Sequence, residues 1–135
     1  MKKSSKKVDW QKAPDIDKMV STLVDRVGID WIIKDRVVCF RSQNSAARAY
    51  ARIWGMPTIL QMAANIDPVY ALEILSEKFD HLPQKKKEEI LLHELAHIPR
   101  TFSGSLVPHT HRRKGSFHDK LKGFLRANRS TSSRA

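Results

Sequence analysis

The chain has 135 residues, of which 41% are apolar, a formal net charge of +11 and a single cysteine, Cys39. This length suits one compact domain; one cysteine excludes an internal disulfide and a cysteine-based zinc cluster, and no apolar run is long enough to span a membrane. The basic start MKKSSKK is not followed by the apolar segment of a signal peptide, so we expect a cytoplasmic protein.

The first half of the chain predicts an arm, a helix and two strands. Residues 1–12 are expected to form a basic, disordered arm, and apolar residues at helical spacing predict a helix that begins at Pro14 and stops at Gly28. The β-branched and aromatic residues of 31–42 predict a strand or hairpin, and a second strand is expected at 49–54. Trp54, at the end of that second strand, is expected to pack in the core.

The second half predicts one further strand and two helices. The stretch 58–67 is compatible with a helical turn or a strand, whereas alternating apolar residues predict a strand that begins at 69. A helix with an apolar stripe at Leu91, Leu95 and Ile98 is expected to follow Pro83. It is expected to end just beyond His97, because Pro99 disfavours helical geometry at the residue before it.

A long loop is then expected, which turns back at residues 102–104 and is followed by a last helix. Ser116 is in a position to cap this helix, which is expected to run to about Asn128. The sequence therefore predicts a single α+β domain over residues 13–128, with a short, mostly antiparallel sheet packed on helices, and a basic disordered tail over 129–135.

The run HELAH within the predicted helix after Pro83 carries the clearest chemical signal. His93 and His97 are four residues apart, so their rings project from adjacent turns of one face and can share one Zn²⁺ ion. Glu94 is rotated by about 100° from His93, which lets it lie beside the metal without binding it. The pattern therefore predicts a zinc site in which Glu94 is the general base for hydrolysis of a peptide bond.

A third metal ligand has to come from further along the chain. A glutamate is excluded because none follows Glu94, which leaves His109, His111 and His118 as candidate ligands. His109 is favoured because it lies 12 residues beyond His97, which is enough for a loop to go out and return. His111 and His118 remain open as alternatives.

Several segments resemble a sparsely characterised archaeal metallopeptidase family. They are CFRS, YARIWGMP, LSEKFD, LLHELAHIP and TFSGSLVPH. The resemblance implies a small zincin-like domain, related in outline to the SprT-type proteases, in which a short sheet backs the zinc helix. His93, Glu94 and His97 carry over from the family motif, and His109 matches its Pro-His position.

The same resemblance implies that an edge strand lines the substrate cleft. The candidate is VYALEIL, residues 69–75, to which an extended peptide would add as a further strand. The alternative is that this segment is a fully paired strand inside a small sheet.

Two classes of function follow from these patterns. The first is a zinc metallopeptidase that acts on a protein or peptide. The second is a non-catalytic or weakly catalytic zincin-like domain that binds nucleic acid or a ribonucleoprotein through its basic termini and the basic loop at 111–115, since a charge of +11 attracts polyanions. A zinc hydrolase of non-peptide amides is also compatible with the motif, and no association with a membrane is expected.

Overall fold

A computed structural model describes residues 7–109 and 117–132. In chain order its elements are β1 (Asp9–Lys12), α1 (Pro14–Val27), the 3₁₀ helix η1 (Lys34–Arg36), β2 (Val37–Gln43), β3 (Ala51–Trp54), α2 (Thr58–Ala64), β4 (Tyr70–Leu75), α3 (Ser76–Phe79), α4 (Gln84–Leu95) and α5 (Phe117–Ser132). Five α-helices and a four-stranded mixed sheet in these ranges confirm the predicted α+β class.

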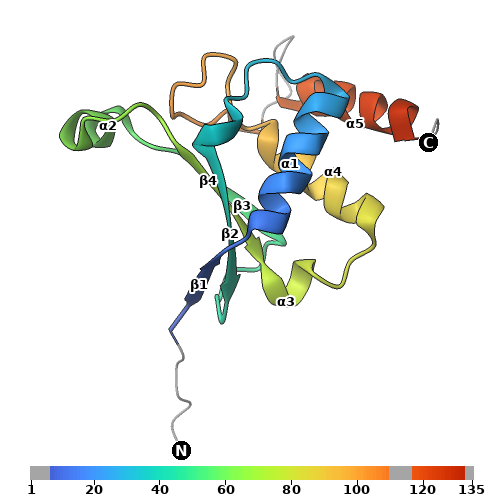
Figure 1. Cartoon of the computed structure of the whole chain (residues 1–135), viewed down its shortest axis with the longest axis horizontal. Helices are drawn as coiled ribbons and strands as arrows, with labels where there is room; N and C mark the ends of the chain where they lie inside the picture. Colours follow the sequence, from blue (N-terminus) through green and yellow to red (C-terminus); the bar gives the residue numbers. More distant parts are fainter. Residues whose placement is uncertain (1–6, 110–116, 133–135) are drawn as a thin grey trace, which may run out of the picture.

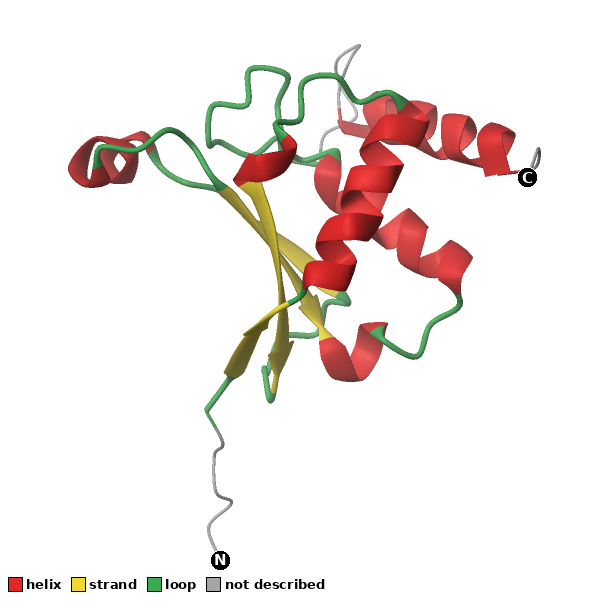
Figure 2. Ribbon diagram, in the orientation of Figure 1, coloured by secondary structure: helices red, strands yellow, loops and turns green. Residues whose placement is uncertain are grey.

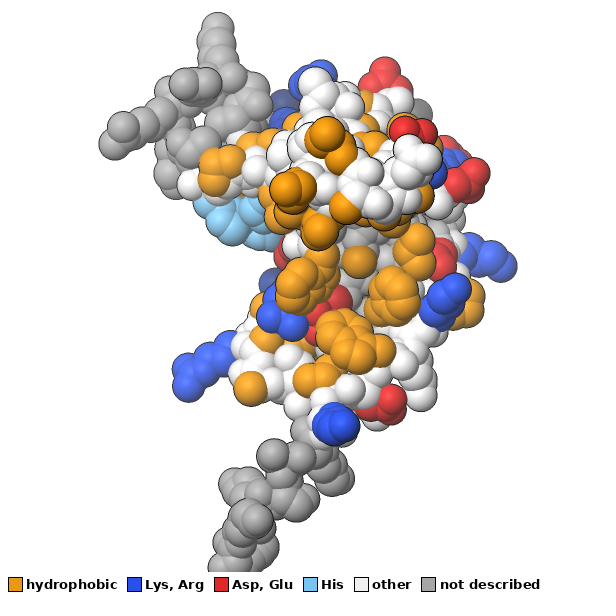
Figure 3. All heavy atoms as spheres, turned by 90° about the vertical axis from the view of Figure 1, so that its left-hand side faces the viewer, with side chains coloured by type: hydrophobic (Ala, Val, Ile, Leu, Met, Phe, Trp, Pro, Cys, Tyr) orange, Lys and Arg blue, Asp and Glu red, His pale blue; other side chains and the backbone are white. Residues whose placement is uncertain are grey.

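The strands lie in the order β1-β2-β4-β3. β2 runs parallel to β4, and the two outer pairs are antiparallel, so most of the pairing is antiparallel as expected. Helices α1, α4 and α5 lie on one side of the sheet, whereas α2 projects at its far end (Figures 1 and 2). The opposite side of the sheet carries many apolar side chains at the surface (Figure 3).

Strand β4 is central, which corrects the expectation that it lines a cleft as an edge strand. It pairs with β2 on one side and β3 on the other, and five of its six residues are buried. Because β4 is paired along both of its edges, the alternative of a fully paired strand is right. Among the described residues, β3 forms the edge beside α4.

Helix α1 begins and ends where its sequence predicts. Pro14 occupies its first turn, and Gly28 ends it in a left-handed conformation with φ 80°. The N–H groups of Gly28 and Ile29 both donate to the carbonyl of Val24, at 2.9 and 3.0 Å. The buried face of α1 then packs on β2 and α4.

Several expected boundaries are corrected. Residues 9–12 of the expected arm form strand β1, all four of which are exposed, so no apolar alternation marks them in the sequence. The strand expected from 31 begins only at Val37, because η1 precedes it. The ambiguous stretch 58–67 contains helix α2, and α5 continues to Ser132.

Helix α4 is anchored by an apolar stripe, as predicted. Leu91, Leu95 and Ile98 are completely buried. The helix ends at Leu95 and not beyond His97. Before Pro99 the chain changes to 3₁₀-type hydrogen bonds, in which the N–H groups of His97 and Ile98 donate to the carbonyls of Glu94 and Leu95, at 3.1 and 3.0 Å. None of the helices in the described ranges is long and apolar enough to cross a membrane.

Candidate metal centre

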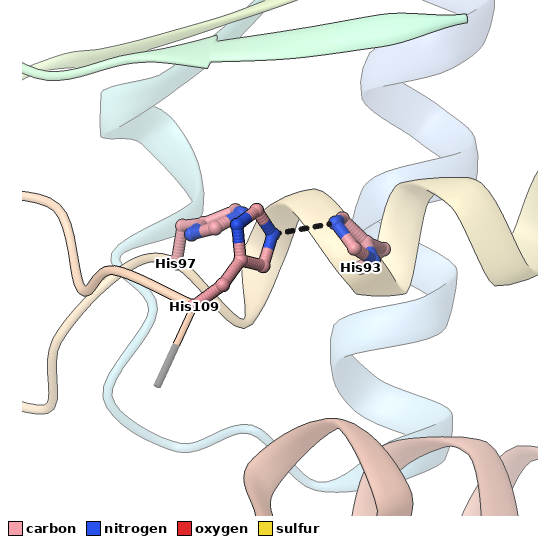
Figure 4. A group of neighbouring side chains, drawn as sticks. All are labelled: His93, His97 and His109. Carbon is pink, nitrogen blue, oxygen red and sulfur yellow. Dashed lines mark hydrogen bonds between the residues drawn. The ribbon is translucent and has the colours of Figure 1, made fainter. Parts of the chain in front are cut away.

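Three histidines converge between α4 and the loop that follows it (Figure 4). His93 lies in the last turn of α4, His97 lies two residues beyond its end, and His109 lies near the end of the described loop. One ring nitrogen from each lies within 4.8 Å of the others, and the Nε2 atoms of His93 and His109 are 3.2 Å apart. The structure thus brings together the two motif histidines and the favoured third candidate.

The ring of His97 is held in one tautomer by the returning loop. Its Nδ1 atom lies 2.6 Å from the carbonyl oxygen of Val107, which can only accept, so Nδ1 carries the proton. The N–H of Val107 donates in turn to the carbonyl of His97, at 2.7 Å. This pair of bonds leaves Nε2 of His97 with a free lone pair and fixes the chain two residues before His109.

The loop turns back where the sequence suggests, at residues 102–104. Phe102 and Gly104 both have positive φ angles, of 50° and 96°. The buried hydroxyl of Tyr70 accepts from the N–H of Gly104 and donates to the carbonyl of Ser105, both at 2.8 Å. Sequence reasoning missed this role of Tyr70, because the alternation of β4 marks it only as a core residue.

Phe117, the first residue of α5, packs under the three imidazoles. Its ring is completely buried, and its centroid lies 4.4, 5.0 and 4.6 Å from those of His97, His93 and His109. The ring stacks on His97 with 25° between the planes, and it meets the other two edge to face. An apolar floor of this kind excludes water from one side of the site.

Burial keeps the motif histidines neutral. It lowers the pKa of His93 to about 4, helped by the positive charges that His97, His109 and His118 would carry. Burial also lowers the pKa of His97, against the hydrogen bond from its ring to Val107. Neutral imidazole is the form that offers a lone pair to a metal ion.

Glu94 follows His93 on α4 and is half-buried, and desolvation by burial raises its pKa to about 7. The backbone N–H of Ile53, on edge strand β3, favours the ionised form and so acts in the opposite direction. Glu94 is absent from the cluster of possible metal ligands, which contains only histidines among the described residues. Its position beside the triad suits a group that exchanges a proton near neutral pH.

A cavity of about 330 Å³ adjoins the triad between β3, α4 and α5. His93 and Glu94 form part of its wall, and Ile90, Leu121 and Leu125 supply apolar surface. A side chain that enters this cavity would lie next to the triad.

Of the two alternative third ligands, only His118 lies in the described residues. His118 is half-buried in the first turn of α5, and its charge acts on His93, but it is not part of the three-histidine cluster. His111 lies outside the described residues, as does Ser116, the expected cap of α5.

A family model described as "Putative phage metallopeptidase" matches residues 8–124. No curated protein and no solved structure matches the chain. The match agrees with the metallopeptidase part of the sequence resemblance. It does not support the archaeal part, because the family is described as a phage family.

Proposed function

The chain belongs to the family of putative phage metallopeptidases, and from this membership we propose that it is a zinc-dependent peptidase. The observation that carries the proposal is the convergence of His93, His97 and His109 next to Glu94. In this assignment the three histidines hold the metal and Glu94 is the general base.

The three histidines fit a zinc ion by the chemistry of their donors. Three imidazole nitrogens with an open fourth position are a common catalytic zinc set, and the donor atoms here lie within 4.8 Å of one another. The bond from Nδ1 of His97 to Val107 is the outer contact that typically orients a zinc-binding imidazole. His109 is exposed, which leaves one side of the site open to a substrate.

Zinc, when bound, supplies Lewis acidity and lowers the pKa of a coordinated water toward neutrality. Glu94 would accept a proton from the water that forms a C–O bond to the substrate carbonyl carbon, and would deliver that proton to the amine nitrogen as the C–N bond breaks. A pKa near 7 suits both transfers, because the carboxylate and the carboxylic acid are then both accessible at neutral pH.

The substrate would lie along edge strand β3, next to the triad. In the register with β4, Ala51 and Ile53 occupy positions whose backbone groups point away from the sheet, and the N–H of Ile53 faces Glu94. An extended peptide can add to such an edge as a further strand. The cavity beside His93 and Glu94 would receive one of its side chains.

Glu94→Gln tests the proposed activity. The wild type, supplied with zinc, should cleave an unstructured protein such as casein, and the variant should be slower by at least about a hundredfold. Zinc content should be the same in both proteins, because Glu94 is not a proposed ligand. A wild type that carries zinc but cleaves nothing, or a variant that cleaves normally, would contradict the assignment.

The net charge of +11 favours binding of nucleic acid as a second candidate function. Much of this charge is carried by the N-terminal stretch, the basic loop and the C-terminal tail. Affinity for single-stranded DNA should then survive Glu94→Gln and fall steeply with salt.

A further inference from the structure

We propose that the apolar surface around α2 is a docking site for an apolar segment of the protein substrate, beside the cleft that holds the scissile bond. The surface, called here the α2 shelf, consists of Trp54, Ile59, Leu60, Met62, Ile66 and Leu106. The inference rests on the proposed peptidase function and adds to it a class of substrate.

The α2 shelf contains most of the large apolar side chains that are exposed in the described part of the chain. Of ten large apolar side chains that are exposed in the described residues, six belong to the shelf. None of the residues of α2 is buried, and Ile59 and Met62 are 73% and 75% exposed. Trp54, expected in the core, is 47% exposed. A gathering of this kind on a protein surface typically marks a site of interaction.

Hydrogen bonds fix helix α2 in place, although none of its residues is fully buried. The side-chain amide of Gln61 donates to the carbonyls of Met56 and Ser103, at 2.7 and 2.9 Å. The N–H of Met56 donates to the carbonyl of Gly104 at 2.7 Å, and Asn65 ends the helix in a left-handed conformation. The shelf is therefore presented in a fixed position, which lowers the entropic cost of binding.

Two chain segments connect the shelf to the metal centre. Along β3, the backbone N–H of Ile53 faces Glu94, and the side chain of the next residue, Trp54, lies on the sheet face that carries Glu73. Along the loop, Leu106 is followed by Val107, which is bonded to His97. Because an extended chain advances about 3.3 Å per residue, a peptide at the triad reaches the shelf within several residues. In Figure 3, apolar side chains of the upper part lie next to histidine side chains, at the rim of a hollow.

The charge around the shelf favours an apolar polypeptide as its occupant, because the arginines next to it are already bonded. Arg52, 4.9 Å from the centroid of the Trp54 ring, pairs with Glu73, and Arg36, which lines a cavity with Met62 and Ile66, donates to backbone carbonyls. Helix α2 contains no charged residue, although the chain as a whole has a net charge of +11. A surface for a polyanion would carry lysines or arginines, because phosphate contacts supply most of the affinity for nucleic acid. Exposed aliphatic side chains on a short helix instead complement leucine-like side chains of a partner.

Cleavage of matched peptides tests the proposal. Once a cleaved bond has been identified in casein, three peptides of equal length are made around it: one with a short run of leucines before the bond, one with the run after it, and one with serines in both places. One of the leucine peptides should have a kcat/KM about tenfold above that of the serine peptide. This advantage should be lost in Ile59→Glu/Met62→Glu and kept in Trp10→Glu, the matched control on the opposite edge strand.

Binding to the Glu94→Gln protein gives a readout that does not require cleavage. A fluorescent leucine peptide should bind about tenfold more weakly when Ile59→Glu/Met62→Glu is added. Shelf-dependent binding without any cleavage by the wild type would overturn the peptidase assignment and leave the docking site standing. Equal binding, or a leucine advantage that persists in the double variant, would overturn the docking site. If Ile59→Glu/Met62→Glu alters the oligomeric state but neither peptide binding nor cleavage, the occupant of the shelf is a second copy of the chain, and this result would also overturn the docking site.

Discussion

The phenyl ring of Phe117 stacks on the imidazole of His97, with the ring centroids 4.4 Å apart and 25° between the planes. His97 is one of the proposed metal ligands, whereas Phe117 has no donor atom for a metal. The same ring also contacts His93 and His109, so the first residue of α5 contacts all three imidazoles. We infer that Phe117 positions them.

Phe117→Leu should weaken zinc binding by about tenfold, as losses of supporting contacts around metal ligands commonly do. Leucine keeps an apolar side chain at this position but cannot stack on His97, so the imidazoles gain rotational freedom. The affinity is measured by competition with a chromophoric chelator.

Phe124→Leu is the matched control for that variant. Phe124 is also a buried phenylalanine of α5, but its ring packs on Trp31, with centroids 5.9 Å apart. The control should lose stability without a change in zinc affinity. Equal zinc affinities for Phe117→Leu and the wild type would show that Phe117 serves only the core.

The stability of the metal-free protein should decrease in acid because of His93. Its pKa is about 4 in the folded protein against an ordinary value of 6.5, so between these values the unfolded chain binds more protons. The free energy of unfolding contributed by His93 therefore falls as the pH decreases from about 6.5 to about 4, by up to about 3 kcal/mol.

Urea denaturation with a chelator present, at several pH values, measures this effect as the difference between the wild type and His93→Gln. Glu94 contributes with the opposite sign, since its raised pKa makes the folded protein bind more protons, but this contribution is shared by both proteins. A difference that does not change with pH would contradict the assigned burial of His93.

Arg52→Leu should destabilise the protein by about 3 kcal/mol, because it leaves a buried carboxylate without its cation. Glu73 is only 1% exposed and accepts from Nε of Arg52, from Nε1 of Trp54 and from the hydroxyl of Ser42. Adding Glu73→Leu should recover part of the loss, as a double-mutant cycle by urea denaturation would measure. If the double variant were the less stable, the ion pair would not be the cause.

How far the sequence determines this fold is clearest at two helices. Helix α1 was predictable to its ends because Pro14, an apolar stripe and Gly28 are all local signals. Helix α2 was ambiguous because none of its residues is buried, so its apolar residues follow no core-facing period. The place of β4 was mistaken for a different reason: a strand's position in a sheet depends on pairing with distant segments, which its own residues do not encode.

The candidate site was predictable where its geometry is local. His93 and His97 are fixed by one helical turn and the turn after it, and Glu94 follows from the same pattern. His109 was identified by elimination. Its position near His93 and His97 depends on contacts that have no sequence signature, such as those of Tyr70 with the loop and of Val107 with His97. The contact of Phe117 with the three histidines was not predicted, because a phenylalanine at the start of a helix usually packs in the core.

The zinc content of the purified protein, made without a histidine tag, tests the central claim most directly. Elemental analysis should find about one zinc ion per chain in the wild type. It should find little zinc in His93→Ala and His109→Ala, and unchanged zinc in His111→Ala and His118→Ala. A wild type that binds no metal even when zinc is offered would contradict the account, and zinc retained in His109→Ala would refute the proposed third ligand.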